Sequence, residues 1–490
     1  MKKLTILMTL ALIPYVSHAR VEEELKRLNK CYALFVRERI PSNDPLWKQV
    51  SAGSKSGTDA CMEIFDKAKL NSRGELPKGS DGQYDYEGMR VLNSFMRFHK
   101  SQFETPDYSQ PLGTGNDRHT RDITDSNDPS YQFLYSLFAP NQPFSKVVTR
   151  DFSIRAIRYS AKSDRSRSVT GAAIPAHTQG AYKTIKDELG ISKTVPNDDI
   201  GGIAPFIPTF VETGILVGLE PDRRDNVLST SHFNSVYSSY KFTSTDVNQH
   251  LGGGVMGTQA YLMGNMGKDG FTTGGTNLFR RWGKHVMQDF LCRDLPALRS
   301  RDVVSEVDPE SKIAFKTGIS CMGCHSSMDP LAGTIRNMRA AWSHNTSQVT
   351  ARIKFIGERT PDLAFAPFPS ISADSNFYRR PANGRLFYRS YDGSIVKEEV
   401  VGLEELGQKM AGTNDLYVCA AKRYYKFLTG IDVNLADIGD INTPQFSDGE
   451  NFQRSRVIDW GLELKKHQSL RTLIKKIIES NAFIYPDRGV

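Results

Sequence analysis

The pentapeptide Cys-Met-Gly-Cys-His at 321–325 constrains this chain more than any other part of its sequence. Two thiols three residues apart on a helical turn can each add to a vinyl group of one porphyrin. The adjacent histidine is then placed under the iron as its proximal ligand. The sequence therefore predicts a helical turn that carries one covalent haem c at Cys321 and Cys324, with His325 as an iron ligand.

Three other roles are open to this cysteine pair. A thioredoxin-like redox pair should open a helix after a strand in a βαβ unit, and no such pattern precedes Ser320. A zinc site needs a second ligand pair, whereas Cys292 and Cys419 each stand alone. The third role is a disulfide between neighbours. The signal peptide expected at residues 1–19 favours haem over all three, because cytochrome c maturation takes place outside the cytoplasm.

The first twenty residues have the organisation of a secretory signal peptide. Lys2 and Lys3 form a basic start, 4–16 is apolar, and small residues lead to a cleavage site after Ala19. The apolar run is shorter than the roughly 20 residues of a membrane span, so an uncleaved anchor is the less favoured alternative. No other stretch approaches that length. We expect a periplasmic or secreted protein with signal residues 1–19 and no membrane span after cleavage.

Loss of Lys2 and Lys3 with the signal peptide lowers the net charge from +8 to +6, a modest excess that can steer acidic partners. Lysines and arginines form no dense block interleaved with aromatic residues, so nucleic-acid binding is not predicted. Acidic residues at 437, 440, 448 and 450 are expected to form a solvated loop, with a calcium site as the alternative.

Four cysteines remain outside the motif, in a chain expected to enter an oxidising compartment. They allow three pairings. Closeness in sequence favours Cys31 with Cys61, which leaves Cys292 with Cys419.

Apolar periodicity predicts a mainly α, multi-domain chain with a small β insertion. We expect a helical N-terminal region at 20–130, a mainly helical middle region at 131–300, and a cytochrome c-like haem domain at 301–490 with an insertion at about 340–400. Individual elements are expected as helices at 276–291, 403–410, 414–429 and 469–481, as renewed helical periodicity over 131–159, and as a hairpin within 377–401.

The residues after the motif, Asp-Pro-Leu-Ala-Gly at 329–333, resemble the Gly-Pro-x-Leu-x-Gly stretch of class I cytochromes c. In that family the proline carbonyl accepts the N–H of the proximal imidazole, so the resemblance implies this role for Pro330. Such a bond fixes the ring and raises the basicity of the ligand. Two departures are Asp329 in place of glycine and a shorter spacing.

The C-terminal half, from about 251 onward, resembles a family of large exported bacterial proteins that end in a monohaem module. The similarity runs through 253–259, 291–292, 321–333, 419–430 and 473–483. The resemblance implies a role in electron transfer. Family precedent also places a methionine ligand downstream of the motif, and Met410 is the first choice. Its rivals are Met328, Met338, His344 and an open or water-bound position.

The leading functional hypothesis is therefore one-electron transfer between periplasmic redox proteins, after haem insertion by the cytochrome c maturation machinery. One alternative is a haem-dependent oxidoreductase, either peroxidase-like or a subunit of an oxidase. Another is a module for binding a surface or polysaccharide ligand, with the haem domain attached to it.

Overall fold

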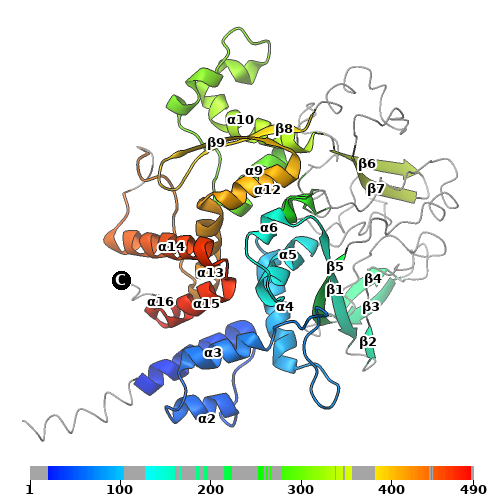
Figure 1. Cartoon of the computed structure of the whole chain (residues 1–490), viewed down its shortest axis with the longest axis vertical. Helices are drawn as coiled ribbons and strands as arrows, with labels where there is room; N and C mark the ends of the chain where they lie inside the picture. Colours follow the sequence, from blue (N-terminus) through cyan, green and yellow to red (C-terminus); the bar gives the residue numbers. More distant parts are fainter. Residues whose placement is uncertain are drawn as a thin grey trace, which may run out of the picture.

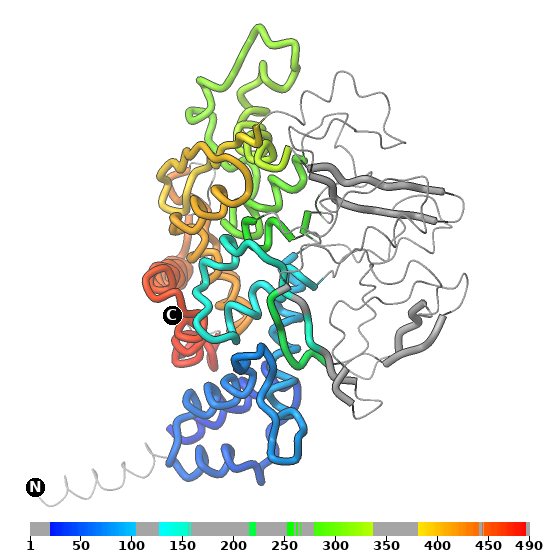
Figure 2. The backbone as a smooth tube through the Cα atoms, turned by 45° about the vertical axis from the view of Figure 1, so that its right-hand side comes forward, coloured from blue at the N-terminus to red at the C-terminus, as the bar shows by residue number. Residues whose placement is uncertain are grey.

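The computed structural model describes residues 20–103, 127–160, 165–167, 182–186, 192–196, 215–222, 252–258, 261–262, 265, 279–336, 338–345, 348–355, 381–440, 443 and 445–486. The expected signal peptide lies outside these residues. Helices supply most of the regular structure in the described part, which confirms the mainly α class. Figures 1 and 2 show the N-terminal helices at one end of the molecule and α10 towards the other.

Helical residues 20–35 open the described chain. The α-helices that follow among the described residues are α2 (Pro45–Ser51), α3 (Gly57–Asp66), α4 (Tyr86–Lys100), α5 (Asp128–Phe138), α6 (Lys146–Thr149), α9 (Arg280–Leu291), α10 (Ile319–Ala332), α12 (Gly402–Gly412), α13 (Asp415–Thr429), α14 (Asp448–His467), α15 (Leu470–Glu479) and α16 (Asn481–Ile484). Short 3₁₀ helices are η2 (Gly254–Gly257), η3 (Ser300–Asp302), η4 (Val304–Glu306), η5 (Ala314–Thr317) and η6 (Gly333–Ile335).

The strands form small antiparallel sheets. They are β1 (Ser153–Ser160), β2 (Arg165–Arg167), β3 (Tyr182–Lys186), β4 (Ser192–Pro196), β5 (Ile215–Asp222), β6 (Met338–Asn345), β7 (Gln348–Phe355), β8 (Asn383–Arg389) and β9 (Ile395–Val401). The order β2-β1-β5 makes one sheet, and β3-β4, β6-β7 and β8-β9 make pairs. The expected hairpin is confirmed in β8-β9, where Gly393 takes a φ of +83° in the turn.

The expected helical pattern over 131–159 is wrong beyond Thr149, because β1 begins at Ser153. Ile154 and Ala156 are buried two residues apart, which is the period of a strand rather than that of a helix. The middle region thus contains a sheet in addition to its helices.

Several helix predictions are confirmed close to their expected ends. Gly430 follows α13 with a left-handed φ of +87°, the conformation that glycine adopts most easily at a helix C-terminus. The side chain of Ser469 accepts a hydrogen bond from the backbone of Thr472 at the start of α15. The structure also contains α12 and α9 where helices were expected.

One hydrophobic core contains residues from all three of the regions expected from the sequence. It includes Phe95 of α4, Tyr131 of α5, Trp282 of α9 and Tyr424 of α13. The regions thus share their packing, and domain boundaries near 130 and 300 stay predictions. Among the described residues, no helix combines the length and apolar character needed to cross a bilayer.

The disulfide between Cys292 and Cys419 is confirmed and joins the end of α9 to α13. The expected bond between Cys31 and Cys61 is not formed. Their side chains meet in the core as two thiols joined by a hydrogen bond, and Cys61 also donates towards the carbonyl of Arg27 over 3.6 Å. Burial raises the pKa of the Cys31 thiol well above its usual range.

Candidate functional site

The Cys-x-x-Cys-His motif lies in the first half of α10, which confirms the helical turn expected there. Met322, Ser326 and Ser327 of this helix are buried. Cys321 is exposed, while Cys324 and His325 are half-buried. The i, i+3 spacing of the two cysteines places them as neighbours on one side of the helix. The motif therefore presents its chemically active side chains at the partly exposed side of α10.

Two glycines let α10 pack closely between α9 and β8. A Cβ at Gly283 of α9 would lie 2.7 Å from the carbonyl oxygen of Met328. A Cβ at Gly384 of β8 would lie 2.7 Å from the carbonyl oxygen of Pro330. Met322 of α10 also packs in a small apolar cluster with Leu298, Val303 and Phe387. Close backbone packing of this kind fixes the helix that carries the motif.

Cys321 and Cys324 are both free thiols. Burial raises the pKa of Cys324, and the neighbouring Cys321 raises it further. The pair is thus present in the reduced form that addition to a vinyl group requires.

The imidazole of His325 is held on one edge and on one face. Its Nδ1 lies 3.0 Å from Oδ2 of Asp329, one helical turn further along. The ring of Phe315 stacks on it with centroids 4.0 Å apart and an interplanar angle of 18°. Stacking covers a face of the ring but leaves the in-plane lone pair of Nε2 accessible. No described residue forms a hydrogen bond with Nε2.

Asp329 is in turn held by Arg280, the first residue of α9. The guanidinium donates from Nε to Oδ1 over 2.7 Å and from Nη2 to Oδ2 over 2.9 Å. Its Cζ also lies 5.0 Å from the centroid of the Phe315 ring. Arg280, Asp329, His325 and Phe315 therefore form one connected group of side chains, named here the imidazole clamp.

In this structure Nδ1 of His325 contacts Asp329, and not the carbonyl of Pro330 as the resemblance implies. Pro330 lies inside α10, and its carbonyl accepts the backbone N–H of Gly333 at the end of the helix. That carbonyl is directed along the helix axis, so it accepts a hydrogen bond at the end of the helix and none from the imidazole. The carboxylate at Asp329 stands where class I cytochromes have a glycine without a side chain.

The candidates for a sixth iron ligand occupy different environments. Met410 of α12 is fully buried in the main core. Met328 lies one turn from His325 on the same helix. Met338 and His344 belong to β6, and their side chains lie outside the described part of the structure. No described contact joins Met410 to the motif, so its role as a ligand stays a prediction.

The residues present fit a covalent haem. Two unbonded thiols lie on the same side of one helix, and the adjacent imidazole offers an unpartnered Nε2 while Nδ1 is anchored. Haem would be held by Cys321, Cys324 and His325. Within the described residues, no group of three or more His, Cys, Asp or Glu side chains is placed to hold a metal ion.

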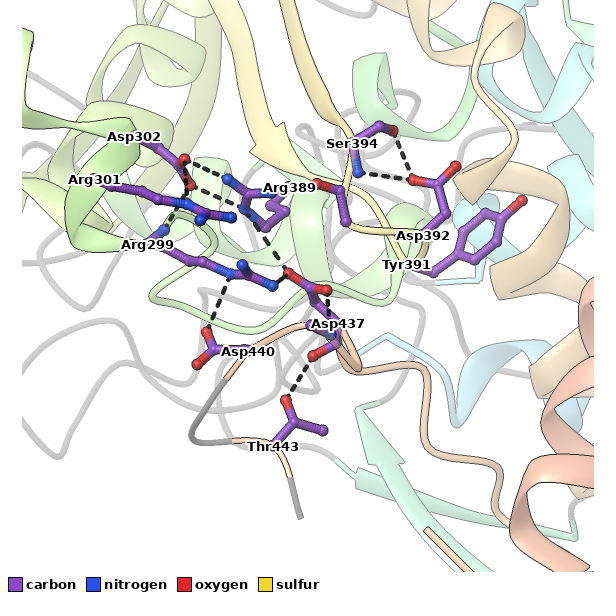
Figure 3. Close-up of polar contacts among 12 residues, drawn as sticks. Arg299, Arg301, Asp302, Arg389, Tyr391, Asp392, Ser394, Asp437, Asp440 and Thr443 are labelled. Carbon is purple, nitrogen blue, oxygen red and sulfur yellow. Dashed lines mark hydrogen bonds and ion pairs between the residues drawn. The ribbon is translucent and has the colours of Figure 1, made fainter. Parts of the chain in front are cut away.

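A second polar cluster, shown in Figure 3, holds the chain that leads into α10. Arg389 of β8 donates to Asp302 over 3.0 Å and lies 3.8 Å from Asp437. Arg299 bonds with Asp437 and lies 3.6 Å from Asp440. A cavity of about 750 Å³ beside this cluster is lined by Arg299, Arg389, Asp437 and Asp440, among others, and by none of the motif residues.

The expected solvated acidic loop is confirmed only in part: Asp448 and Glu450 are exposed, but they belong to α14, and Asp437 is not solvated. Asp437 is only 11% exposed, since arginines surround its carboxylate. Ser447 and Glu450 form a capping box that starts α14, with Asp448 in its first turn. Capping and ion pairing account for these acidic residues.

Sequence reasoning missed three members of the imidazole clamp. The i, i+4 spacing of His325 and Asp329 on a helix could have indicated their contact. Arg280 and Phe315 gave no such signal, because their positions depend on how α9 and the chain before α10 pack.

Comparison of the chain with protein-family models, with curated proteins and with solved structures gives no match.

Proposed function

We propose that this chain is an exported c-type cytochrome with one covalent haem, which transfers single electrons between periplasmic redox proteins. The observation that carries the proposal is the arrangement on α10: two free thiols on one side of the helix and an anchored imidazole with a free Nε2. When bound, the haem supplies a one-electron couple between ferrous and ferric iron.

The chain's own residues account for attachment without an external oxidant. Each thiol of Cys321 and Cys324 would add across a vinyl double bond, with sulfur bonded to one carbon and the thiol hydrogen placed on the other. Nε2 of His325 would bind the iron, while Asp329 holds the opposite edge of the ring. The C-terminal segment 301–490 is then the cytochrome c-like module of the protein.

Partial exposure of the motif supports electron transfer in particular. Cys321 is exposed and the side chain of His325 is 21% exposed, so a porphyrin bonded there has an edge near solvent. A partner protein can approach such an edge closely. The net charge of +8, which falls to +6 when Lys2 and Lys3 leave with the signal peptide, would favour acidic partners.

A haem-dependent oxidoreductase is the second candidate, and one observation favours it. A carboxylate at Nδ1 makes an imidazole a more basic ligand than a carbonyl does. Peroxidases also hold iron through a proximal histidine. Optical spectra distinguish the two candidates, because a closed coordination sphere gives a low-spin haem and an open one gives high-spin features.

Haem attachment is tested by producing the protein together with a functional cytochrome c maturation system. We expect haem stain on the denatured wild-type band and a loss of most of that stain in Cys324→Ala. Cys31→Ala is the matched control, because this cysteine is buried outside the motif. Equal staining of wild type and Cys324→Ala, or an unstained wild type, would contradict the proposed function.

A further inference from the structure

The contact that distinguishes this motif is the one between His325 and a carboxylate within the same helix. Nδ1 and Oδ2 of Asp329 are 3.0 Å apart, and the Asp329 side chain is 13% exposed. A carboxylate only accepts, so Nδ1 carries a proton, and in the neutral ring the lone pair lies on Nε2. The ring is therefore held in the tautomer that can bind iron.

Arg280 fixes the position of this carboxylate. Its two hydrogen bonds, of 2.7 and 2.9 Å, occupy both oxygens of Asp329 in the bidentate geometry that guanidinium favours. Gly283, one turn further along α9, allows the close packing of α9 on α10 that brings these side chains together. Phe315 closes the clamp by stacking on the imidazole and lying beside the guanidinium.

We propose that Asp329 is the residue that orients the proximal imidazole and lowers the reduction potential of the haem, and that Arg280 positions Asp329 and moderates its effect. The inference rests on the proposed function. Donation of Nδ1–H to a carboxylate gives the imidazole partial anionic character, which stabilises oxidised iron more than reduced iron.

The two residues act on the potential in opposite directions. Asp329→Asn removes the negative charge beside Nδ1 of His325, so the reduction potential of the haem rises. Arg280→Gln removes the positive charge that draws electron density from the carboxylate, so the potential falls. Arg280→Lys keeps the charge without the bidentate geometry and should lie closer to wild type. A purely structural role would not produce shifts of opposite sign.

The experiment is an equilibrium redox titration of the haem-loaded proteins, preceded by haem staining of each. Asp308→Asn is the matched control, since it removes an exposed carboxylate from the chain that leads into α10. Its potential should equal that of wild type. A rise in Asp329→Asn with a fall in Arg280→Gln supports the inference.

Two results overturn the inference: an unchanged or lowered potential in Asp329→Asn, or a raised potential in Arg280→Gln. If Asp329→Asn does not mature, the sign of the shift in Arg280→Gln still decides. A wild-type protein without covalent haem contradicts the proposed function, and haem staining detects that before any potential is measured. The two failures are therefore distinguishable.

Discussion

Met410, the first candidate for the sixth ligand, is constrained at the residue scale by its burial. Its side chain is fully buried in the core beneath α12, where solvent cannot compete for the sulfur. If it is the sixth ligand, Met410→Leu removes the iron bond while nearly conserving volume. We expect loss of the far-red charge-transfer band typical of methionine ligation, with a stability change below about 1.5 kcal/mol.

Optical spectra of the oxidised protein and urea unfolding measure these two quantities. Met328→Leu, on the same helix as His325, is the comparison. A band that survives in Met410→Leu would assign this methionine to the core alone and direct attention to the other candidates.

The clamp around His325 shows which residues local sequence can identify. The motif is local, and so is the i, i+4 relation of His325 to Asp329. Arg280 precedes Asp329 by 49 residues, and only the packing of α9 against α10 joins them. The helical turn at the motif was therefore predictable from local sequence, whereas the contacts of Arg280 and Phe315 depend on tertiary packing.

Elements were predictable where local signals at their ends agreed with apolar periodicity. Asn414 and Gly430 bound α13 in this way. β1 was missed because its partner β5 lies far along the chain, at Ile215–Asp222, and such a partner leaves no local signal. The capping box of Ser447 and Glu450 was readable, but the acidic residues around it favoured a loop instead.

At the scale of elements, the disulfide between α9 and α13 leads to a prediction about the free energy of unfolding. Cys292 and Cys419 are separated by 127 positions, and closing such a loop stabilises the fold by up to about 5 kcal/mol in the chain-entropy model. We expect the double variant Cys292→Ala/Cys419→Ala to lose much of this free energy of unfolding. Non-reducing peptide maps should show the bridge in wild type.

Cys31→Ala serves as the control for loss of a buried sulfur without loss of a bridge. Free thiols at both 292 and 419 in the oxidised wild type would contradict the assignment. So would equal stability of wild type and the double variant under non-reducing conditions.

At the scale of the whole molecule, the two ends of the chain pack together. Arg471 of α15 forms two hydrogen bonds with Asp66 of α3, and Arg27 donates to the carbonyl of Ser480. Contacts across more than 400 positions have no sequence signature. This is why composition and periodicity suggested separate regions along a chain whose core is shared.

His99 links three helices of this shared core and gives it a dependence on pH. Its ring lies 3.0 Å from the hydroxyl of Tyr424 on α13 and stacks on Phe133 of α5. Burial, followed by the charge of Arg423, lowers the pKa of His99 from 6.5 to about 3. The unfolded chain therefore binds a proton that the folded protein excludes.

The sign of the effect follows from this difference. Stability from a neutral His99 is complete above pH 6.5 and is lost as pH falls towards 3, at roughly 1.4 kcal/mol per pH unit. Between pH 7 and 5 we expect wild type to lose about 2 kcal/mol more than His99→Gln, whose side chain does not titrate. Urea unfolding followed by circular dichroism at each pH measures the difference. Equal losses of stability in both proteins would show that His99 is not the source of the pH dependence.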